Sequence, residues 1–403
     1  MLLSLREVNP ETLVETQDDE LKPKDRKSVW LSVHTEFSSV EAIWRQFEKN
    51  ADCFAFQTFD FLETWYEEIG CRQNVDLAIV VAWGLDAVPI MILPLGIEKS
   101  GFARKLTWLG NDVNDYNAPL LGPGFSERIS PGDFPALWKD IVSFLPAHDL
   151  IELLRQPAEI DGQANPFLEL PTQPNASGAH MTVLGADFDA YYEKKRNSKA
   201  RRSMRSRRKK LEEMGDARYV HPATDRDIAA SVAKLVELKS ASLKTMGAKD
   251  FLGQPGYEEF YKALAVKSGA GGIAHVSHLE VAGEYVAGSW GLVHKRRFYY
   301  LLASYDRVRF GRYAPGVQAL VEVMRWAVNK GVETFDFTIG DEPYKYEWCE
   351  IQSDLYDHLQ AKTFRGALLL FKTKLLLALK RKIKHTPLLW ETFTKLRTRI
   401  FGK

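Results

Sequence analysis

The order of secondary-structure elements repeats about 200 residues along the chain, and this repetition constrains the fold more than any single motif. In the first half, apolar periodicity and Gly-containing turns predict strands at 77–83, 88–95 and 106–109, then a helix at 134–145 and a strand at 150–154. In the second half, they predict strands at 273–281, 285–293 and 298–303, then a helix at 315–329 and a strand at 334–338. Residue identity between the halves is low, so a chance likeness of two mixed α/β segments is the alternative. The repeated order predicts two lobes of one topology.

The length of 403 residues also suits two domains better than one core. A stretch rich in Pro, Gly and Asn at 161–178 separates the two halves, and we place the boundary within it. We predict an N-terminal lobe at 28–175 and a C-terminal lobe at 176–360, with a polar leader at 1–27 and a basic tail at 361–403.

The composition excludes several classes of protein. With 45% hydrophobic and 27% charged residues, the chain is neither disordered nor fibrous. Cys53, Cys71 and Cys349 are too few and too scattered for a disulfide framework or a Cys-rich metal site. His275 and His278 lie three apart on an expected strand and point to opposite faces, so we predict no metal site. We find no signal-peptide pattern and no apolar run of about 20 residues, and therefore expect a cytoplasmic protein.

The net charge of +1 hides two strongly basic segments. Residues 194–210 contain eleven Lys or Arg and no acid, and residues 362–403 contain twelve basic residues and one acid. Each segment carries +11, so the rest of the chain carries −21. Such asymmetry indicates local contacts with anions and argues against a generally basic nucleic-acid-binding protein.

A basic loop at 304–314 joins an expected buried strand to the expected helix at 315–329. Pro315 suits the first helical turn because its missing N–H would have no partner there. The N–H groups of 316–318 then face outward at the positive end of the helix dipole, where a phosphate binds well. Further positive charge beside that position comes from Arg307, Arg309 and Arg312. An exposed basic loop before an ordinary helix is the alternative.

The segment after this helix ends a strand and enters a polar, aromatic turn, FDFTIGDEPYKY at 335–346. Together with Tyr305-Asp306 and Ala314-Pro315-Gly316, this pattern resembles the GNAT-type acetyltransferase domain of bacterial exopolysaccharide- and cellulose-biosynthesis proteins, the CelD-like family. Weaker matches in the first lobe are Phe56-Gln57-Thr58, the helix with Trp65-Tyr66, and Leu109-Gly110 to Asp115-Tyr116. The resemblance covers about 54–348.

The resemblance implies an α+β protein with a tandem GNAT fold, related in outline to the FemAB-type transferases. Each lobe would have a mixed central sheet flanked by helices. An acyl-CoA donor, acetyl-CoA in the first place, would lie where the strands at 298–303 and 334–338 splay apart, with its diphosphate over the start of the helix at 315–329. The residues implied in donor binding are Arg309, Gly311, Arg312, Tyr313, Ala314, Pro315 and Gly316. Val308 stands where the usual GNAT phosphate loop has Gln or Arg, so this loop departs from the family pattern.

GNAT chemistry is direct attack of an amine or hydroxyl on a thioester, and the sequence has no Gly-x-Ser-x-Gly motif that would indicate a covalent intermediate. The general base would be Asp336 or Asp115, and the acid Tyr344 or Tyr305. As alternatives, Asp336 caps a strand end and Asp115 holds its loop through an Asx-turn. The residues expected to contact the substrate are Tyr116, Trp65 and Lys345, of which Lys345 would bind an anionic acceptor or the donor phosphates.

Each basic segment has two interpretations. A helix at 191–214 would bind an anionic acceptor, a lipid phosphate or the donor phosphates, or it is solvated and pairs with the acidic remainder. In the tail, one face of an expected helix collects Phe364, Leu368, Phe371, Leu375, Leu379 and Ile383. Flanking Lys and Arg then predict peripheral contact of 362–403 with the inner face of a membrane, and packing on the second lobe is the alternative.

These features favour an enzyme, a CoA-dependent N- or O-acyltransferase that acts on a small-molecule or saccharide acceptor in polysaccharide biosynthesis. An aminoacyl-tRNA-dependent transferase of the FemAB kind is the second hypothesis. Without a tRNA donor we expect no nucleic-acid partner, because the basic run contains no aromatic residues for stacking. A non-catalytic GNAT-like module in polysaccharide biosynthesis is the third hypothesis.

Overall fold

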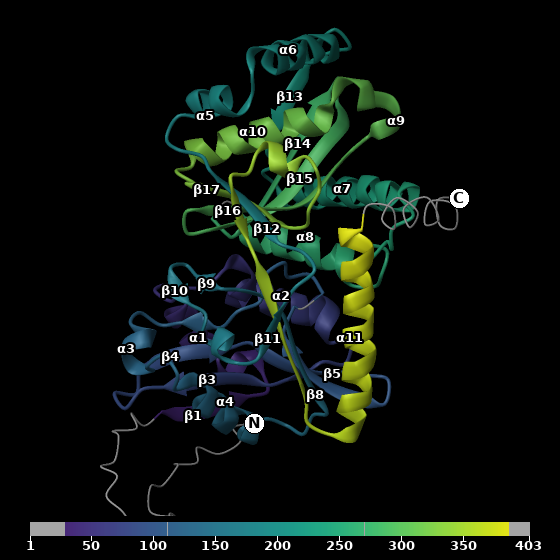
Figure 1. The fold of residues 1–403 in the computed structure, drawn as a ribbon. Helices are drawn as coiled ribbons and strands as arrows, with labels where there is room; N and C mark the ends of the chain where they lie inside the picture. Colours follow the sequence, from purple (N-terminus) through teal and green to yellow (C-terminus); the bar gives the residue numbers. More distant parts are fainter. Residues whose placement is uncertain (1–28, 111, 270, 387–403) are drawn as a thin grey trace, which may run out of the picture. The chain divides into compact units, whose positions relative to one another are not determined.

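The computed structural model describes residues 29–110, 112–269 and 271–386, and these form two compact units (Figure 1). Of the described residues, the N-terminal unit holds 29–63, Gln73–Asn175 and Leu355–Lys374, and the C-terminal unit holds Thr64–Arg72, Ala176–Asp354 and 375–386. Each unit has its own mixed sheets and helices, so the predicted α+β class is confirmed. The predicted polar leader at 1–27 lies outside the described residues.

The N-terminal unit contains two larger sheets and a two-stranded one, β10-β9, with bounds Gln163–Ala164 and Glu159–Ile160. The first has the order β1-β3-β4-β7, with bounds Trp30–His34, Ile79–Trp83, Pro89–Leu93 and Leu120–Leu121. The second has the order β11-β19-β8-β6-β5-β2, with bounds Thr172–Pro174, Leu355–Ala361, Leu150–Pro157, Ala103–Trp108, Leu95–Ser100 and Asp76–Leu77. The principal helices are α1 (Glu41–Phe47), α2 (Phe59–Trp65), α3 (Phe125–Arg128) and α4 (Phe134–Phe144).

The C-terminal unit is built on one seven-stranded sheet. Its order is β13-β14-β15-β16-β17-β12-β18, with bounds Ala217–Val220, Ala274–Val281, Glu284–His294, Arg297–Tyr305, Thr334–Ile339, Ala179–Val183 and Ile351–Ser353. Its helices are α5 (Phe188–Lys195), α6 (Ser198–Glu212), α7 (Asp225–Thr245), α8 (Tyr257–Ser268), α9 (Arg307–Phe310) and α10 (Pro315–Asn329). Helix α10 lies on one face of the sheet, and α7 and α8 lie on the other (Figure 1).

The repeated order of elements is confirmed at the level of topology. In each unit an antiparallel meander is followed by a helix and then by a strand parallel to the last meander strand, β6 with β8 across α4 and β16 with β17 across α10. In both units an antiparallel strand from outside this sequence of elements pairs with the far edge of the parallel pair, β19 with β8 and β12 with β17. Even the backbone irregularities correspond, since Arg155 near the end of β8 and Thr338 near the end of β17 have φ of 58° and 59°.

Aromatic side chains dominate the core between α10 and the centre of the C-terminal sheet. The rings of Phe298 and Phe335, on the two parallel strands, stack at 4.9 Å, and Phe337 continues the cluster beyond them. On α10 the apolar positions Leu320, Val323 and Met324 are buried against these rings, at the spacing of a helix face. Each such side chain contributes about 1.5–3 kcal/mol by leaving water. This packing fixes α10 over the β16–β17 pair.

Three local predictions need correction. The predicted helix at 191–214 is interrupted at Arg196 and Asn197, because the Asn197 side chain accepts the N–H of Ala200 and starts α6 as a new helix. The predicted loop at 304–314 contains α9 and a 3₁₀ turn. The predicted C-terminal lobe at 176–360 is too long, because β19 pairs antiparallel with β8 and β11 in the N-terminal sheet.

The predicted tail helix is α11 (Phe364–His385), and 387–403 lie outside the described residues. Thr363 anchors its start in the N-terminal unit, where the hydroxyl donates to a carboxylate oxygen of Asp149 at 2.6 Å. Among the residues that the structure describes, no helix is both long enough and apolar enough to cross a membrane.

Candidate active site

The two central parallel strands of the C-terminal unit begin side by side and then separate. Strands β16 and β17 are paired at three positions, from Arg297↔Thr334 to Tyr299↔Asp336. Beyond these positions β16 continues to Tyr305 and β17 to Ile339, each held only by its outer neighbour, β15 or β12. The facing edges therefore present backbone N–H and C=O groups that need partners other than each other. This is the geometry that the resemblance implied for the strands at 298–303 and 334–338.

A bulge on each strand accompanies the separation. On β16 the pairing with β15 shifts between Trp290↔Leu302 and Gly291↔Tyr300, which leaves Leu301 as an extra residue. On β17 the pairing with β12 shifts between His180↔Thr338 and Met181↔Asp336. A bulge bends its strand and increases its twist, so both strands turn where they part.

Asp336 is placed to hold the bulge of β17. Its side chain is fully buried, and its Oδ1 accepts the N–H of Thr338 at 2.8 Å, where the backbone has a positive φ of 59°. The Arg297 Nη1 lies 3.7 Å from Asp336 Oδ2. The structure thus gives Asp336 the capping contact that was the alternative to a catalytic role, and its role as general base stays a prediction.

Tyr344 lies beside the end of β17, with its ring centroid 6.0 Å from that of Phe337. Although 40% of the residue is exposed, desolvation of the phenol, with smaller contributions from Tyr300 and Glu342, raises the pKa of Tyr344 above its usual range. The phenol therefore stays protonated at neutral pH. Because a general acid works best with a pKa near the working pH, this shift makes Tyr344 a weaker proton donor, and its role as the acid stays a prediction.

Lys345 is buried beside the last residues of β17. Its ammonium donates to the carbonyl oxygens of Ile339 at 2.7 Å and Thr338 at 3.4 Å, and it lies 3.0 Å from Glu342 Oε2. Only 4% of the residue is exposed, and these contacts give the Lys345 side chain a structural role. Its predicted contact with an acceptor or with donor phosphates stays a prediction.

Lys239 of α7 is a candidate that the sequence interpretation missed. Its ammonium donates to the carbonyl of Ala303, on the part of β16 that has left β17, at 3.3 Å. Burial lowers the pKa of Lys239, with Glu342 acting in the opposite direction. A lysine with a lowered pKa next to a backbone opening is a typical functional candidate. The sequence did contain a signal for it. Lys239 lies on the same face of α7 as the buried residues Val232 and Leu235, where an apolar side chain would be expected.

The start of α10 is shaped by Ala314 and Gly316. Ala314 adopts a left-handed conformation (φ 53°, ψ 50°), and its carbonyl accepts the N–H groups of both Val317 and Gln318 at 3.2 Å. Two of the three N–H groups predicted to face a phosphate are therefore already used, which corrects that expectation. Gly316 lies against the ring of Tyr305, so a Cβ at this position would be only 2.9 Å from the Tyr305 Cδ1.

The arginines of this loop differ in their partners. Arg309 forms an ion pair with Glu284 at 2.5 Å and lies over the ring of Phe310. Arg312 lies over the ring of Tyr313, which is buried. Within the described residues, neither Arg307 nor Arg312 has an acid at ion-pair distance, so both are available to an anion. Gly311 begins the 3₁₀ turn that leads to Ala314, and Pro315 is the first residue of α10, as predicted.

The predicted site residues of the first lobe are mostly core residues. Tyr116 is 1% exposed and its ring contacts Phe54 and Phe56 at 5.3 and 5.7 Å. Trp65 is also 1% exposed. Asp115 is half-buried, and its charge acts on the pKa of Arg155, which burial lowers. A catalytic role for Asp115 and substrate contacts for Tyr116 and Trp65 stay predictions.

Two further observations bear on the chemistry. Burial raises the pKa of the Cys349 thiol to about 12, and the charge of Asp336 adds to this, so the thiol is neutral and weakly nucleophilic at neutral pH. Among the described residues, no group of three or more His, Cys, Asp or Glu side chains is placed to hold a metal ion.

Along the C-terminal unit, Tyr305 ends the first diverging strand, Pro315 begins the helix, and Tyr344 follows the second diverging strand, in the order that the resemblance implied. Residues 198–346 match the family model described as an acetyltransferase (GNAT) domain. This match contains the whole β16–α10–β17 arrangement, so the diverging strands belong to a GNAT domain. No curated protein matches the chain.

Solved structures share the fold over most of the chain. FemX is similar with a TM-score of 0.56 and 11% identity over 81% of this chain and 96% of that one. A conserved protein of unknown function from Bacteroides thetaiotaomicron has a TM-score of 0.50 and 13% identity, over 82% and 99%. The C-terminal domain of a putative lysylphosphatidylglycerol synthetase from Agrobacterium fabrum has a TM-score of 0.50 and 11% identity, over 85% and 98%. At these identities the likeness is one of fold, and it extends across both units of the tandem GNAT architecture.

Proposed function

We propose that the protein transfers an acyl group from acyl-CoA to an amine or hydroxyl of a saccharide acceptor. The separation of β16 and β17 within the GNAT domain carries this proposal. An extended thioester arm placed between the strands would satisfy the backbone groups that they no longer offer to each other. The diphosphate would lie over the start of α10, near the two loop arginines without acid partners, Arg307 and Arg312.

The chemistry follows from what the site offers. The acceptor attacks the thioester carbon directly, a backbone N–H of the diverging part of β16 stabilises the oxyanion, and the leaving thiolate takes a proton. Tyr344 and Tyr305 remain the candidate acids for the last step, and desolvation makes the phenol of Tyr344 a weaker donor than that of an ordinary tyrosine. Asp336 and Asp115 remain the candidate bases, and Lys239 joins them because burial favours its neutral amine. The neutral thiol of Cys349 supports a mechanism without a cysteine acyl-enzyme.

The nature of the acceptor rests on the resemblance. The motifs at 305–316 and 335–346 resemble the CelD-like proteins of exopolysaccharide and cellulose biosynthesis, and this supports a sugar or polysaccharide intermediate as acceptor. The fold alone does not select an acceptor, because acceptor pockets are formed by variable loops.

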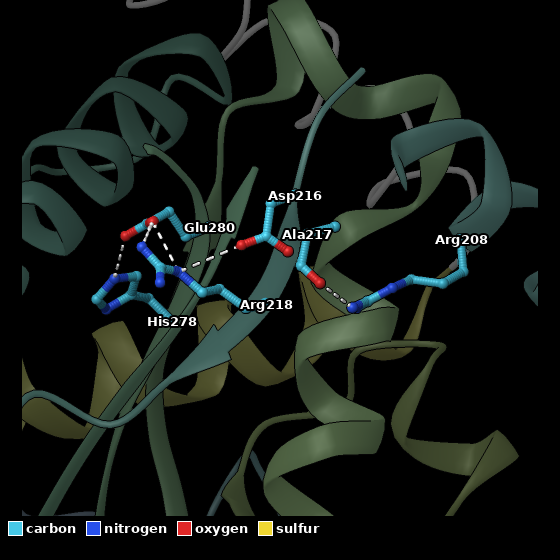
Figure 2. A network of polar contacts seen from close by, with 6 residues as sticks. All are labelled: Arg208, Asp216, Ala217, Arg218, His278 and Glu280. Carbon is cyan, nitrogen blue, oxygen red and sulfur yellow. Dashed lines mark hydrogen bonds and ion pairs between the residues drawn. The ribbon is translucent and has the colours of Figure 1, made fainter. Parts of the chain in front are cut away.

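A FemAB-like, aminoacyl-tRNA-dependent transferase is the second candidate, and helix α6 favours it. Arg208 near the end of α6 is held by the protein, because it donates to the carbonyl of Ala217 on β13, and Arg218, Glu280 and His278 continue this polar network (Figure 2). Six other basic residues of α6 are exposed, and none has an acid at ion-pair distance among the described residues: Lys199, Arg202, Arg205, Arg207, Lys209 and Lys210. Such a face suits a polyanionic donor.

Calorimetric titration of the full chain with acetyl-CoA tests the first candidate, with Gly316→Ala as the informative variant. We expect saturable binding by the wild-type protein and at least a tenfold loss in Gly316→Ala, because the added Cβ displaces the Tyr305 ring at the start of α10. Gly271→Ala is the matched control, since a Cβ there meets nothing within 4 Å. Absence of acetyl-CoA binding, together with binding of aminoacyl-tRNA, would replace the first candidate with the second.

A further inference from the structure

Helix α11 presents an apolar face to solvent that no described part of the protein covers. On one side of α11 the exposed fractions are 87% for Phe364, 55% for Leu368, 68% for Phe371 and 59% for Leu375, whereas Leu376, 55% exposed, lies about 120° around the helix from Phe364. Single exposed apolar residues are ordinary on a protein surface. These four differ because they fall on one side of the helix, within about 60° of one another at 3.6 residues per turn. A contiguous apolar face of this kind marks an interaction surface.

The opposite side of α11 already has its partner. Gly366 is buried, and a Cβ there would lie 1.7 Å from the carbonyl oxygen of Asp149 in the N-terminal unit. Leu369, Leu370 and Thr373 follow it at helical spacing and are half-buried. The side of α11 that carries Gly366 is therefore packed on the N-terminal unit. Turning the helix about its axis to cover the apolar side would remove the close approach at Gly366.

Charge identifies the partner of the open side. Arg365 and Lys372 lie about 80–100° from Phe364 on one flank, and Lys374 lies about 80° away on the other. All three side chains are exposed, and the sequence from 362 to 385 contains no acid. An apolar strip between basic flanks matches the interface of an anionic bilayer, where the apolar side chains enter the acyl region and the cations remain among the phosphates.

We propose that α11 binds the surface of membranes rich in anionic phospholipid, with the face formed by Phe364, Leu368, Phe371 and Leu375 inserted and Arg365, Lys372 and Lys374 at the phosphates. This binding goes beyond the proposed acyl transfer and does not depend on it. It places the protein at a membrane surface through its N-terminal unit, to which the start of α11 is anchored.

Vesicle flotation of the full chain tests the proposal. We expect the protein to float with vesicles of phosphatidylglycerol and phosphatidylcholine at low salt, and to bind vesicles of phosphatidylcholine alone at least tenfold more weakly. The informative variant is Leu368→Glu, which we expect to lower the partition coefficient at least tenfold. Leu85→Glu is the matched control, because Leu85 is 70% exposed in the turn between β3 and β4 of the same unit. It should bind as the wild-type protein does.

A second variant separates charge from apolar contact. Replacing Arg365, Lys372 and Lys374 together by Gln should lower binding to the anionic vesicles on the order of a hundredfold, at roughly fivefold for each basic residue removed. The same variant should bind phosphatidylcholine vesicles as weakly as the wild-type protein. All variants change exposed residues, and unchanged circular dichroism confirms that they are folded. Failure of the wild-type chain to float with anionic vesicles, or equal binding of Leu368→Glu and Leu85→Glu, would overturn the proposal.

Discussion

Asp336 offers the sharpest test of how the strand separation is maintained. Its carboxylate has two separable functions, since one oxygen accepts the N–H of Thr338 and the other lies near Arg297. Asp336→Asn keeps an acceptor for the Thr338 N–H and removes only the charge. Asp336→Ala removes both. The two variants therefore distinguish a support for the bulge from a charged group in the chemistry.

The expected magnitudes follow from burial. Asp336→Ala leaves the N–H of Thr338, a residue 2% exposed, without an acceptor, which costs about 1–3 kcal/mol. Loss of the partner of Arg297 adds less than the figure for a fully buried pair, because the Arg297 side chain is 22% exposed. We expect Asp336→Ala to lower the free energy of unfolding by about 2–4 kcal/mol, and Asp336→Asn by about half as much.

Urea denaturation followed by circular dichroism measures these differences, and thiol release from acetyl-CoA over a panel of amino sugars measures turnover. If Asp336 is the general base, Asp336→Asn keeps donor binding and loses about 10²–10⁴-fold in kcat. If it only supports the bulge, Asp336→Asn retains most of the turnover. Equal destabilisation by the two variants would refute the role that we assign to the hydrogen bond with Thr338.

Three further predictions concern other parts of the C-terminal unit. Lys239→Met should leave the free energy of unfolding nearly unchanged, because the amine is already desolvated. If this lysine is the general base, the variant should lose the rise of kcat with pH, and an unchanged pH–rate profile would exclude Lys239 as the base. Burial lowers the pKa of His275 to about 3 in the folded chain. As the pH drops from about 6.5 toward 3, the imidazole is therefore protonated in the unfolded chain but not in the folded one, and the free energy of unfolding should fall. In urea titrations at several pH values, His275→Phe should reduce that slope by up to about 1.4 kcal/mol per pH unit, and an unaltered slope would contradict this assignment. Asn197→Ala should lower the free energy of unfolding by about 1 kcal/mol through the lost N-cap of α6, measured by urea denaturation against the wild-type chain, and no loss would rule out the cap.

The sequence predicted the scaffold of the site well, because it depends on local patterns. The bounds of α10 agree with the predicted 315–329, and β14, β15, β16 and β17 lie within a few residues of their predicted positions. Apolar periodicity, Pro315 at the helix start and Gly331 after its end are all local signals. The splay of β16 and β17 came from the family resemblance and was confirmed by their short pairing.

The errors arose where distant contacts decide. No strand was predicted at 355–361, and the pairing of β19 with β8 and β11 places this segment in the N-terminal sheet. The break before α6 depends on the Asn197 side chain competing for the helix start, against a long run of helix-forming residues. Lys239 was missed because its importance comes from one carbonyl on β16, far away in the sequence.

Hydrogen–deuterium exchange with and without acetyl-CoA tests the central claim most directly. If the donor lies between the diverging strands, backbone amides at 300–305 and at the start of α10 should exchange more slowly in its presence. Those of β6, the counterpart of β16 in the N-terminal unit, should exchange at the same rate. Protection confined to β6, or no protection at 300–305 at a saturating acetyl-CoA concentration, would contradict the account.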